Sequence, residues 1–253
     1  MLDFDPANSF GYEVSKRYDG PAGRGDEDAA VAFLARLAGD AATRADGNAR
    51  ALELAVGTGR IALPLARAGV RVDGIELSSD MVDRMREKPG GDAIAVTPGD
   101  MSSVTTGRGY GLVYLVYNTI GNLLTQDDQV RCFENAARHL VPGGVFVLEC
   151  GIHDALARRY RHYVNAENIA LGSVTLEACQ YDPVTQVIDK SHVTIGADGI
   201  FLDPIRLRLA NPPEFDLMAR LAGLRLRDRW GGWDGEPFTA HSWRHVSVYE
   251  RPA

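Results

Sequence analysis

The chain has 253 residues, of which 45% are hydrophobic and 24% charged, an average composition for a globular protein and enough length for one large α/β domain. Its 27 lysines and arginines against 34 aspartates and glutamates give a net charge of −7, which argues against a dedicated nucleic-acid binder with a basic footprint. No apolar run approaches the roughly 18 residues that span a membrane, and the N-terminus does not resemble a signal peptide.

The chain's three cysteines, Cys132, Cys150 and Cys179, are widely spaced and include no C-x-x-C pair. They therefore predict neither a disulfide framework nor a zinc site, and they fit a reducing compartment. We expect a cytoplasmic α/β protein without a metal centre, whose partners include neither nucleic acid nor a membrane.

The first 50 residues predict an N-terminal helical lid or cap. Aromatic side chains mix with charges over residues 1–28, and apolar residues recur at helical spacing over residues 29–38. Residues 39–50 are polar and contain glycine, asparagine and aspartate, which predicts a loop.

Residues 51–150 alternate short apolar runs with helical segments. The predicted strands cover residues 51–56, 70–76, 93–97, 111–117 and 145–150, and the predicted helices cover residues 60–68, 79–88 and 126–140. Pro142-Gly143-Gly144 predicts a turn before the fifth strand. Alternation of this kind, with nearly all-apolar strands, indicates parallel strands covered on both faces, a doubly wound Rossmann-like sheet.

The last third of the chain has a different pattern. Alternating segments between residues 168 and 210 predict an antiparallel β insertion with one face in water. A helix over residues 213–222 and strands over 224–229 and 245–250 complete a seven-stranded, mostly parallel sheet. We expect a single domain, with residues 51–150 as its cofactor-binding core and residues 211–253 as its final helix and strand pair.

A glycine-rich turn lies between the first strand and the first helix of the core. In Gly57-Thr58-Gly59 the two glycines allow a tight turn and a close approach of backbone to a ligand. Glu76 ends the second strand, 17 residues after Gly59, where a carboxylate can accept the hydroxyls of an adenosine ribose. Because Gly57-x-Gly59-x-x-Ala62 also fits a dinucleotide fingerprint, these residues alone leave the nucleotide class open.

Three further features distinguish a dinucleotide site from a site for another adenosine-containing ligand. Glu53 lies inside the first strand, where a dinucleotide site normally has an apolar residue and where a carboxylate suits a positive group. Asp100 follows the third strand, within reach of an adenine amine. Tyr117-Asn118-Thr119 ends the fourth strand with polar groups, at the carboxyl edge where open parallel sheets bind their ligands.

In this order and spacing the residues resemble the class I S-adenosylmethionine-dependent methyltransferases, over about residues 10–150. The one departure is Ala55, which stands where glycine is commoner. The family's motifs have counterparts, in chain order, in Glu53-Leu-Ala55-Val-Gly57-Thr-Gly59, Glu76, Gly99-Asp100, LVYNTIGNLL (115–124) and HLVPGGVFVLE (139–149).

The resemblance implies S-adenosyl-L-methionine (SAM) as cofactor and a role for each matching position. The implied cofactor-binding residues are Tyr12, Tyr18, Glu53, Ala55, Gly57, Thr58, Gly59, Arg60, Glu76, Leu77, Met81, Asp100, Met101, Tyr117 and Asn118. Both glycines would bring backbone beside the methionine part, with Glu53 near its amino end. Asn118 would lie near the sulfonium, and a tyrosine or Arg60 at the cofactor's carboxylate. Glu76 would hold the ribose hydroxyls, Leu77 and Met81 would pack against the adenine, and Asp100 and Met101 would flank its amine and edge.

The implied reaction is transfer of the methyl group to a nitrogen or oxygen of a small-molecule acceptor. The acceptor needs a base only if it starts protonated, and His153 and His241 are the candidates at the carboxyl edge. Trp230, Trp233 and Phe238 either shape an acceptor pocket or simply pack.

The stretch from Glu214 to Ala240 is similar to actinobacterial small-molecule and peptide methyltransferases. The β insertion is similar to one that caps the acceptor site or forms a dimer contact in sugar N-methyltransferases, so the chain is a monomer or a homodimer. Alternatives are an NAD-dependent oxidoreductase and a SAM-binding protein without transfer activity.

Overall fold

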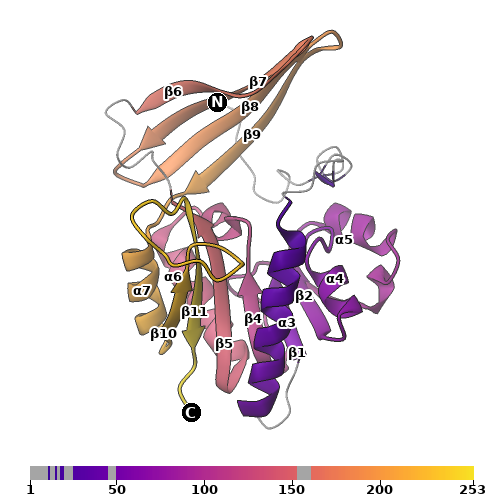
Figure 1. The fold of residues 1–253 in the computed structure, drawn as a ribbon, viewed down its shortest axis with the longest axis vertical. Coiled ribbons are helices and arrows are strands. Elements are labelled where there is room, and N and C mark those ends of the chain that lie inside the picture. The colour runs from indigo at the N-terminus through magenta and orange to yellow at the C-terminus, as the bar shows by residue number, and fades with distance from the viewer. Residues whose placement is uncertain (1–10, 12–14, 16–17, 20–24, 45–49, 153–160) are drawn as a thin grey trace.

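The structure is a computed structural model, which describes residues 11, 15, 18–19, 25–44, 50–152 and 161–253. Tyr12 and His153, two of the predicted site residues, lie outside these residues. The described chain forms a main α/β body and a separate four-stranded sheet (Figure 1).

The main sheet has seven strands in the order β10-β11-β5-β4-β1-β2-β3. The five strands from β3 to β5 are parallel, β11 is antiparallel to β5, and β10 is antiparallel to β11, so β10 runs in the direction of β5. This confirms the predicted seven-stranded, mostly parallel sheet. The strands are β1 (Arg50–Leu54), β2 (Arg71–Glu76), β3 (Ala95–Pro98), β4 (Tyr110–Leu115), β5 (Leu140–Gly151), β10 (Arg225–Trp230) and β11 (Arg244–Glu250).

Helices cover both faces of this sheet, as nearly all-apolar parallel strands require. One face packs against α3, α4 and α5, and the other against α6 and α7 (Figure 1). The helices are α3 (Glu27–Arg44), α4 (Ala62–Arg67), α5 (Ser79–Arg86), α6 (Gln126–His139) and α7 (Pro212–Leu221), with short 3₁₀ turns η1 (Gly91–Ala93) and η2 (Thr119–Asn122).

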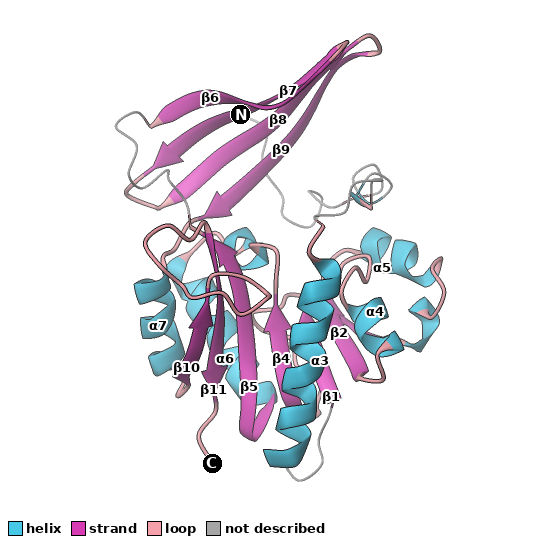
Figure 2. Cartoon of the chain, in the orientation of Figure 1, coloured by secondary structure: helices cyan, strands magenta, loops and turns pink. Residues whose placement is uncertain are grey.

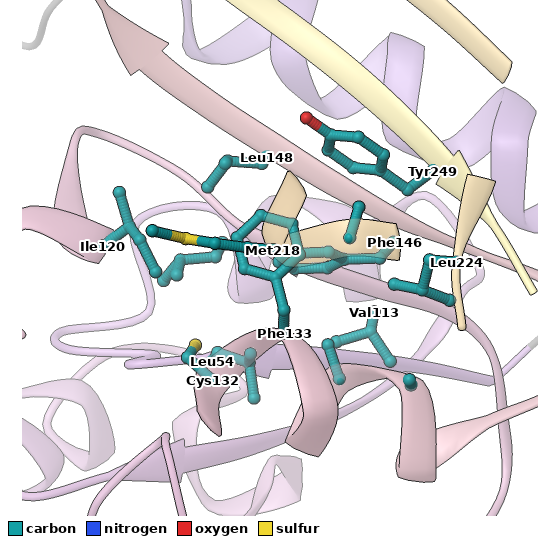
Figure 3. Close-up of a cluster of buried hydrophobic side chains, with 14 of the residues drawn as sticks. Leu54, Val113, Ile120, Cys132, Phe133, Phe146, Leu148, Met218, Leu224 and Tyr249 are labelled. Atoms are coloured by element: carbon teal, nitrogen blue, oxygen red, sulfur yellow. The ribbon is translucent and has the colours of Figure 1, made fainter. Parts of the chain in front are cut away.

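An aromatic cluster forms the core on the α6 and α7 face. The Phe133 ring from α6 meets Phe146 of β5 nearly edge-on, with centroids 5.2 Å apart, and Tyr249 of β11 at 5.6 Å (Figure 3). Edge-to-face pairs at this separation are favourable beyond the area they bury. The cluster fixes α6 against the centre of the sheet, and α6 begins beside the site described below.

The second sheet is an antiparallel meander in the order β6-β7-β8-β9, inserted between β5 and α7. Its strands are β6 (His162–Ala170), β7 (Ser173–Asp182), β8 (Val187–Gly196) and β9 (Gly199–Arg208). It lies beyond the carboxyl ends of the parallel strands (Figure 2). Its base packs on η2, where a Cβ on Gly121 would lie 3.3 Å from Leu207, and it has a small core of its own around Cys179, Tyr181 and Ile188. We call this sheet the cap sheet.

Three expectations from the sequence need correction. Helix α3 continues through Gly39 to Arg44 instead of giving way to a loop at residue 39, because Ala38 and Ala41 extend its buried stripe. This packing outweighs the roughly 1 kcal/mol that an exposed glycine costs in a helix. The cap sheet begins at His162 and not near 168, since polar residues of β6 pair with β7 without an apolar pattern.

The third correction concerns Pro142-Gly143-Gly144, which forms the start of β5 and not a turn before it. Gly143 adopts a left-handed φ of 76°, and its N–H donates to the carbonyl of Arg251. The N–H of Arg251 in turn donates to the carbonyl of Gly144. The chain beyond β11 therefore draws these glycines into the sheet. Within the described residues, no helix combines the length and apolarity needed to cross a membrane.

Candidate active site

A cavity of about 350 Å³ opens at the carboxyl ends of β1, β2 and β3. Eight of the predicted cofactor residues line it: Tyr18, Ala55, Gly57, Glu76, Leu77, Met81, Asp100 and Met101. The other lining residues are Ile75, Ser78, Gly99, Thr119, Asn122, Leu123, Leu124 and Asp128. Gly99 and residues 119–124 lie in segments that resemble the family's motifs, whereas Ile75, Ser78 and Asp128 were not singled out from the sequence.

Glu76 is held in place by the backbone around it. One carboxylate oxygen accepts from the Gly57 N–H at 2.8 Å, and the other accepts from the N–H groups of Leu77 and Ser78, each at 2.9 Å. Burial raises the pKa of this carboxyl above its usual value, against the lowering effect of the three N–H donors. A carboxylate has about four lone-pair positions, so one position on the oxygen facing Gly57 is left for a further donor such as a ribose hydroxyl.

The two glycines of the turn have different surroundings. Gly57 has a φ of 55°, and a Cβ there would meet nothing within 4 Å, so its backbone borders open space in the cavity wall. Gly59 has a φ of 74°, and a Cβ there would lie 2.7 Å from Met85 and 2.9 Å from Leu63. The Gly59 position therefore serves the packing of α4 against α5, and a role beside the cofactor stays a prediction. Ala55 lines the cavity with a φ of 55°, which is uncommon for a residue with a side chain.

Glu53 is buried in β1 and is not among the residues that line the cavity. Its carboxyl accepts a hydrogen bond from the Tyr114 hydroxyl of the neighbouring strand β4 at 3.0 Å. Burial raises its pKa to about 8, and the nearby Glu76 charge adds to the increase. At neutral pH the carboxyl is therefore mostly protonated. Its predicted place near the amino end of the cofactor stays a prediction.

Tyr117 and Asn118 form a strained turn after β4. Both have a φ of 60°, and residues with side chains held in this region cost about 1–3 kcal/mol each and cluster at functional sites. The Tyr117 N–H donates to the carboxylate of Glu149, and the Asn118 side-chain oxygen accepts from the Gly151 N–H. The end of β5 thus holds the end of β4, and η2 continues directly from this turn into the cavity wall.

The remaining predicted cofactor residues, Thr58 and Arg60, bind the N-terminal segment. The Thr58 hydroxyl donates to Asp19 at 2.7 Å. Arg60 donates to the Tyr18 carbonyl at 2.5 Å, and its guanidinium lies 4.8 Å from the Tyr18 ring centroid. It also lies 3.8 Å from Glu27. Arg60 is therefore already engaged, and its predicted contact with a cofactor carboxylate stays a prediction.

The second catalytic candidate, His241, is exposed and does not line the cavity. Its backbone N–H donates to the Thr239 hydroxyl at 3.2 Å. Trp233 is buried, with its ring 5.5 Å from that of Phe33, so it packs in the core. A base role for either histidine remains untested by this geometry.

The cavity is acidic and apolar. Glu76, Asp100 and Asp128 contribute carboxylates, and no lysine, arginine or histidine occurs among the lining residues that the structure describes. Such a surface attracts a cation and offers no basic side chain to a pyrophosphate. Ile75 of β2, Met81 of α5 and Met101 of the Asp100 loop give the cavity its apolar surface.

Comparison with known proteins gives matches of three kinds. A family model described as a methyltransferase domain matches residues 51–144. The solved structure of the CcbJ methyltransferase from Streptomyces caelestis superposes with a TM-score of 0.88 and 35% identity, covering 99% of this chain and 100% of that one.

Two characterised relatives are also similar. The cypemycin N-terminal methyltransferase of a Streptomyces species is 29% identical over 207 residues, covering 79% of this chain and 82% of its own length. The dTDP-3-amino-3,6-dideoxy-α-D-glucopyranose N,N-dimethyltransferase of Streptomyces fradiae is 36% identical over 98 residues. That match covers 39% of this chain and 38% of that relative.

Proposed function

This chain belongs to the class I S-adenosylmethionine-dependent methyltransferases, with SAM as the methyl donor, and on that premise we propose that it methylates an amine nitrogen of a small-molecule acceptor. The observation that supports this use of the site is the acidic cavity in which Glu76 is joined to Gly57.

The residues present fit the cofactor. Glu76 has a lone-pair position left for a ribose hydroxyl, and Leu77 and Met81 provide apolar surface for the adenine. Asp100 uses one oxygen to accept the Ser102 N–H at 2.7 Å and lines the cavity, where it can accept from the adenine amine. When bound, SAM supplies a methyl group already activated by a positively charged sulfur.

The protein's own contribution is alignment. Displacement at the methyl carbon needs the acceptor lone pair in line with the bond that breaks, and good alignment is worth about 7–11 kcal/mol in favourable cases. The turn at Tyr117 and Asn118 is suited to this task, because Glu149 and Gly151 hold it in a conformation that it would not adopt alone. η2 extends this rigid edge along the cavity.

Nitrogen is favoured over oxygen by two considerations. Both characterised relatives are named for N-methylation, one of a peptide N-terminus and one of an amino sugar. A neutral amine is also a good nucleophile without losing a proton first, whereas a hydroxyl needs a base to become one. An NAD-dependent oxidoreductase is disfavoured because a pyrophosphate would face carboxylates in this cavity.

We further propose a homodimer formed through one face of the cap sheet. Cross-strand neighbours share a face of a sheet, and two successive rows on this face carry only apolar side chains. These eight residues, which we call the apolar cap face, are Ile169, Val174, Ile195 and Ile200 in one row and Ala166, Leu176, Val193 and Leu202 in the next.

Three large side chains of the apolar cap face are mostly uncovered. Ile169, Ile200 and Leu202 are 77%, 64% and 62% exposed, and the opposite face carries Glu177 and His192. The absence of charge among its eight members suits an identical face, packed as a sandwich about 10 Å apart. From strand spacing, the pair buries on the order of 1,000 Å², the lower limit for a stable interface.

The protein is proposed to act in the cytoplasm. Cys132, Cys150 and Cys179 are all free and buried, which suits a reducing compartment.

Incubation with methyl-deuterated SAM and a panel of acceptors tests the proposed function, with products read by mass spectrometry. The panel pairs amino-sugar nucleotides and peptides with free N-termini against their hydroxyl and N-acetyl counterparts. Labelled product from the amines alone supports nitrogen transfer. Product from the hydroxyl compounds alone would overturn it, and calorimetric titration with S-adenosylhomocysteine (SAH) separately checks the cofactor site.

A further inference from the structure

Lys88 lies just beyond helix α5, on the side of the glycine turn. Its N–H donates to the Met85 carbonyl, and the chain then turns sharply at Gly90 and Gly91. A Cβ on Gly91 would lie 2.1 Å from the Met85 carbonyl oxygen, so this turn accepts only glycine. The side chain of Lys88 is 27% exposed. It extends back to the Gly57–Gly59 turn, where its amine reaches Thr58.

Lys88 closes a triangle of contacts with Asp19 and Thr58. Its amine lies 2.6 Å from one carboxylate oxygen of Asp19 and donates to the Thr58 carbonyl at 2.7 Å. The other Asp19 oxygen accepts from the Thr58 hydroxyl at 2.7 Å. Burial of Asp19 would raise its pKa, but the hydrogen bonds from Lys88 and Thr58 outweigh it and lower the pKa. Asp19 is therefore an ionised partner of Lys88 at neutral pH.

Asp19 is the neighbour of Tyr18, which lines the cofactor cavity. Arg60 holds Tyr18 through its carbonyl and ring, while Lys88 and Thr58 hold Asp19. Two cations, Arg60 and Lys88, thus attach this dipeptide to the glycine turn and the residue after it. Lys88 is not among the residues that line the cavity, and it reaches this dipeptide through the Asp19 carboxylate.

We propose that Lys88 is a positioning residue for SAM: through Asp19 it fixes Tyr18 as a wall of the cavity at the glycine turn. This inference rests on the proposed cofactor site. A surface ion pair alone would contribute about 0–1 kcal/mol to folding and nothing to ligand affinity. The Lys88–Asp19 pair differs because it joins a cavity wall to the loop that the cofactor contacts.

Calorimetric titration of SAH tests the proposal in the wild type, Lys88→Met, Asp19→Asn and the double variant. Each single change is expected to raise the Kd about tenfold, since either removes a charge-assisted contact. The double variant is expected to bind no more weakly than the weaker single variant. Lys88→Arg is expected to recover most of the affinity. The control Arg86→Met, which removes an exposed cation whose partner is Asp83 at 3.5 Å, is expected to leave the Kd unchanged.

Thermal unfolding without ligand separates positioning from folding. The proposal requires that Lys88→Met unfold within a few degrees of the wild type while its Kd rises. Wild-type affinity in Lys88→Met, or singles whose effects multiply in the double variant, would overturn the role of Lys88. Failure of the wild type itself to bind SAH would overturn the cofactor site instead, so the two failures are distinguishable.

Discussion

The carboxylate of Glu76 and the backbone N–H of Gly57 are joined by a hydrogen bond of 2.8 Å. This bond links the end of β2 to the turn after β1, two of the segments that line the cavity. Since the other oxygen of Glu76 is held by the next two N–H groups, the acid is fixed before any ligand arrives. A preorganised acceptor of this kind reduces the ordering that binding must otherwise accomplish.

Glu76→Gln should therefore weaken SAH binding at least 30-fold. The amide keeps the size of the side chain, but its NH₂ group replaces an acceptor, so one of the three backbone N–H groups loses its partner. Calorimetric titration measures the change. Glu87→Gln, at an exposed site paired with Arg84, is the matched control and should bind as the wild type does. Equal affinities for the Glu76 and Glu87 variants would show that Glu76 does not hold the cofactor.

Alanine at the two glycines of the turn should separate binding from folding. Gly59→Ala places a methyl group against Met85 and Leu63 at positive φ and should cost about 2–4 kcal/mol of stability. Gly57→Ala enters open space and should cost only about 1 kcal/mol in folding, but its methyl group borders the cavity and should weaken SAH binding. Urea unfolding and calorimetry on both variants test this division. The reverse pattern would contradict the assignment of Gly57 to the ligand.

The order of motifs predicted much of the site, because the carboxyl ends of neighbouring parallel strands meet at one edge. Gly57, Glu76 and Asp100 each follow a predicted strand directly, so their convergence in one cavity follows from topology. The wall formed by η2 was indicated only by the family resemblance of residues 115–124, since a left-handed turn followed by a 3₁₀ segment has no periodicity that predicts it. For Asp128 the sequence did contain a signal of a helix start, Thr125 followed three residues later by an acid. In the structure Thr125 caps α6 by accepting the Asp128 N–H.

Other features depend on contacts that no local pattern encodes. Lys88 and Asp19 are far apart in sequence, and nothing near Lys88 distinguishes it from a surface lysine. Helix α3 continues through Gly39 because Ala41, just beyond it, is buried. Tertiary packing of this kind routinely overrides local propensity.

A charge on the apolar cap face should dissociate the proposed dimer. Leu202→Asp puts a carboxylate on this face at the edge strand β9, where pairing with an identical copy would bury it without a partner. Light scattering after size exclusion should show a dimer for the wild type and a monomer for the variant. Thr194→Asp, one strand away on the opposite face, is the control and should remain dimeric. A monomeric wild type would refute the interface.

Glu53 should make the stability of the ligand-free protein depend on pH. Its folded pKa of about 8 lies above the unfolded value near 4.5, so the folded state holds an extra proton between these limits. The stabilisation is complete below pH 4.5 and is lost as pH rises through 8, with a slope of up to about 1.4 kcal/mol per pH unit. Relative to Glu53→Gln, the wild type should lose roughly 1–3 kcal/mol between pH 5.5 and 8.5. Parallel profiles for the two proteins in urea unfolding would contradict the raised pKa.

The same carboxyl should release a proton when the cofactor binds. If Glu53 lies near the amino end of SAM, as the family resemblance implies, a positive group beside it favours the ionised form and lowers its pKa toward or below 7. Calorimetric titration of SAH at pH 7, in phosphate and in Tris, measures the protons released, because the two buffers differ in ionisation enthalpy. We expect between about 0.5 and 1 proton for the wild type and close to none for Glu53→Gln. Equal proton release in both would place the titrating group elsewhere and leave Glu53 as a buried partner of Tyr114 only.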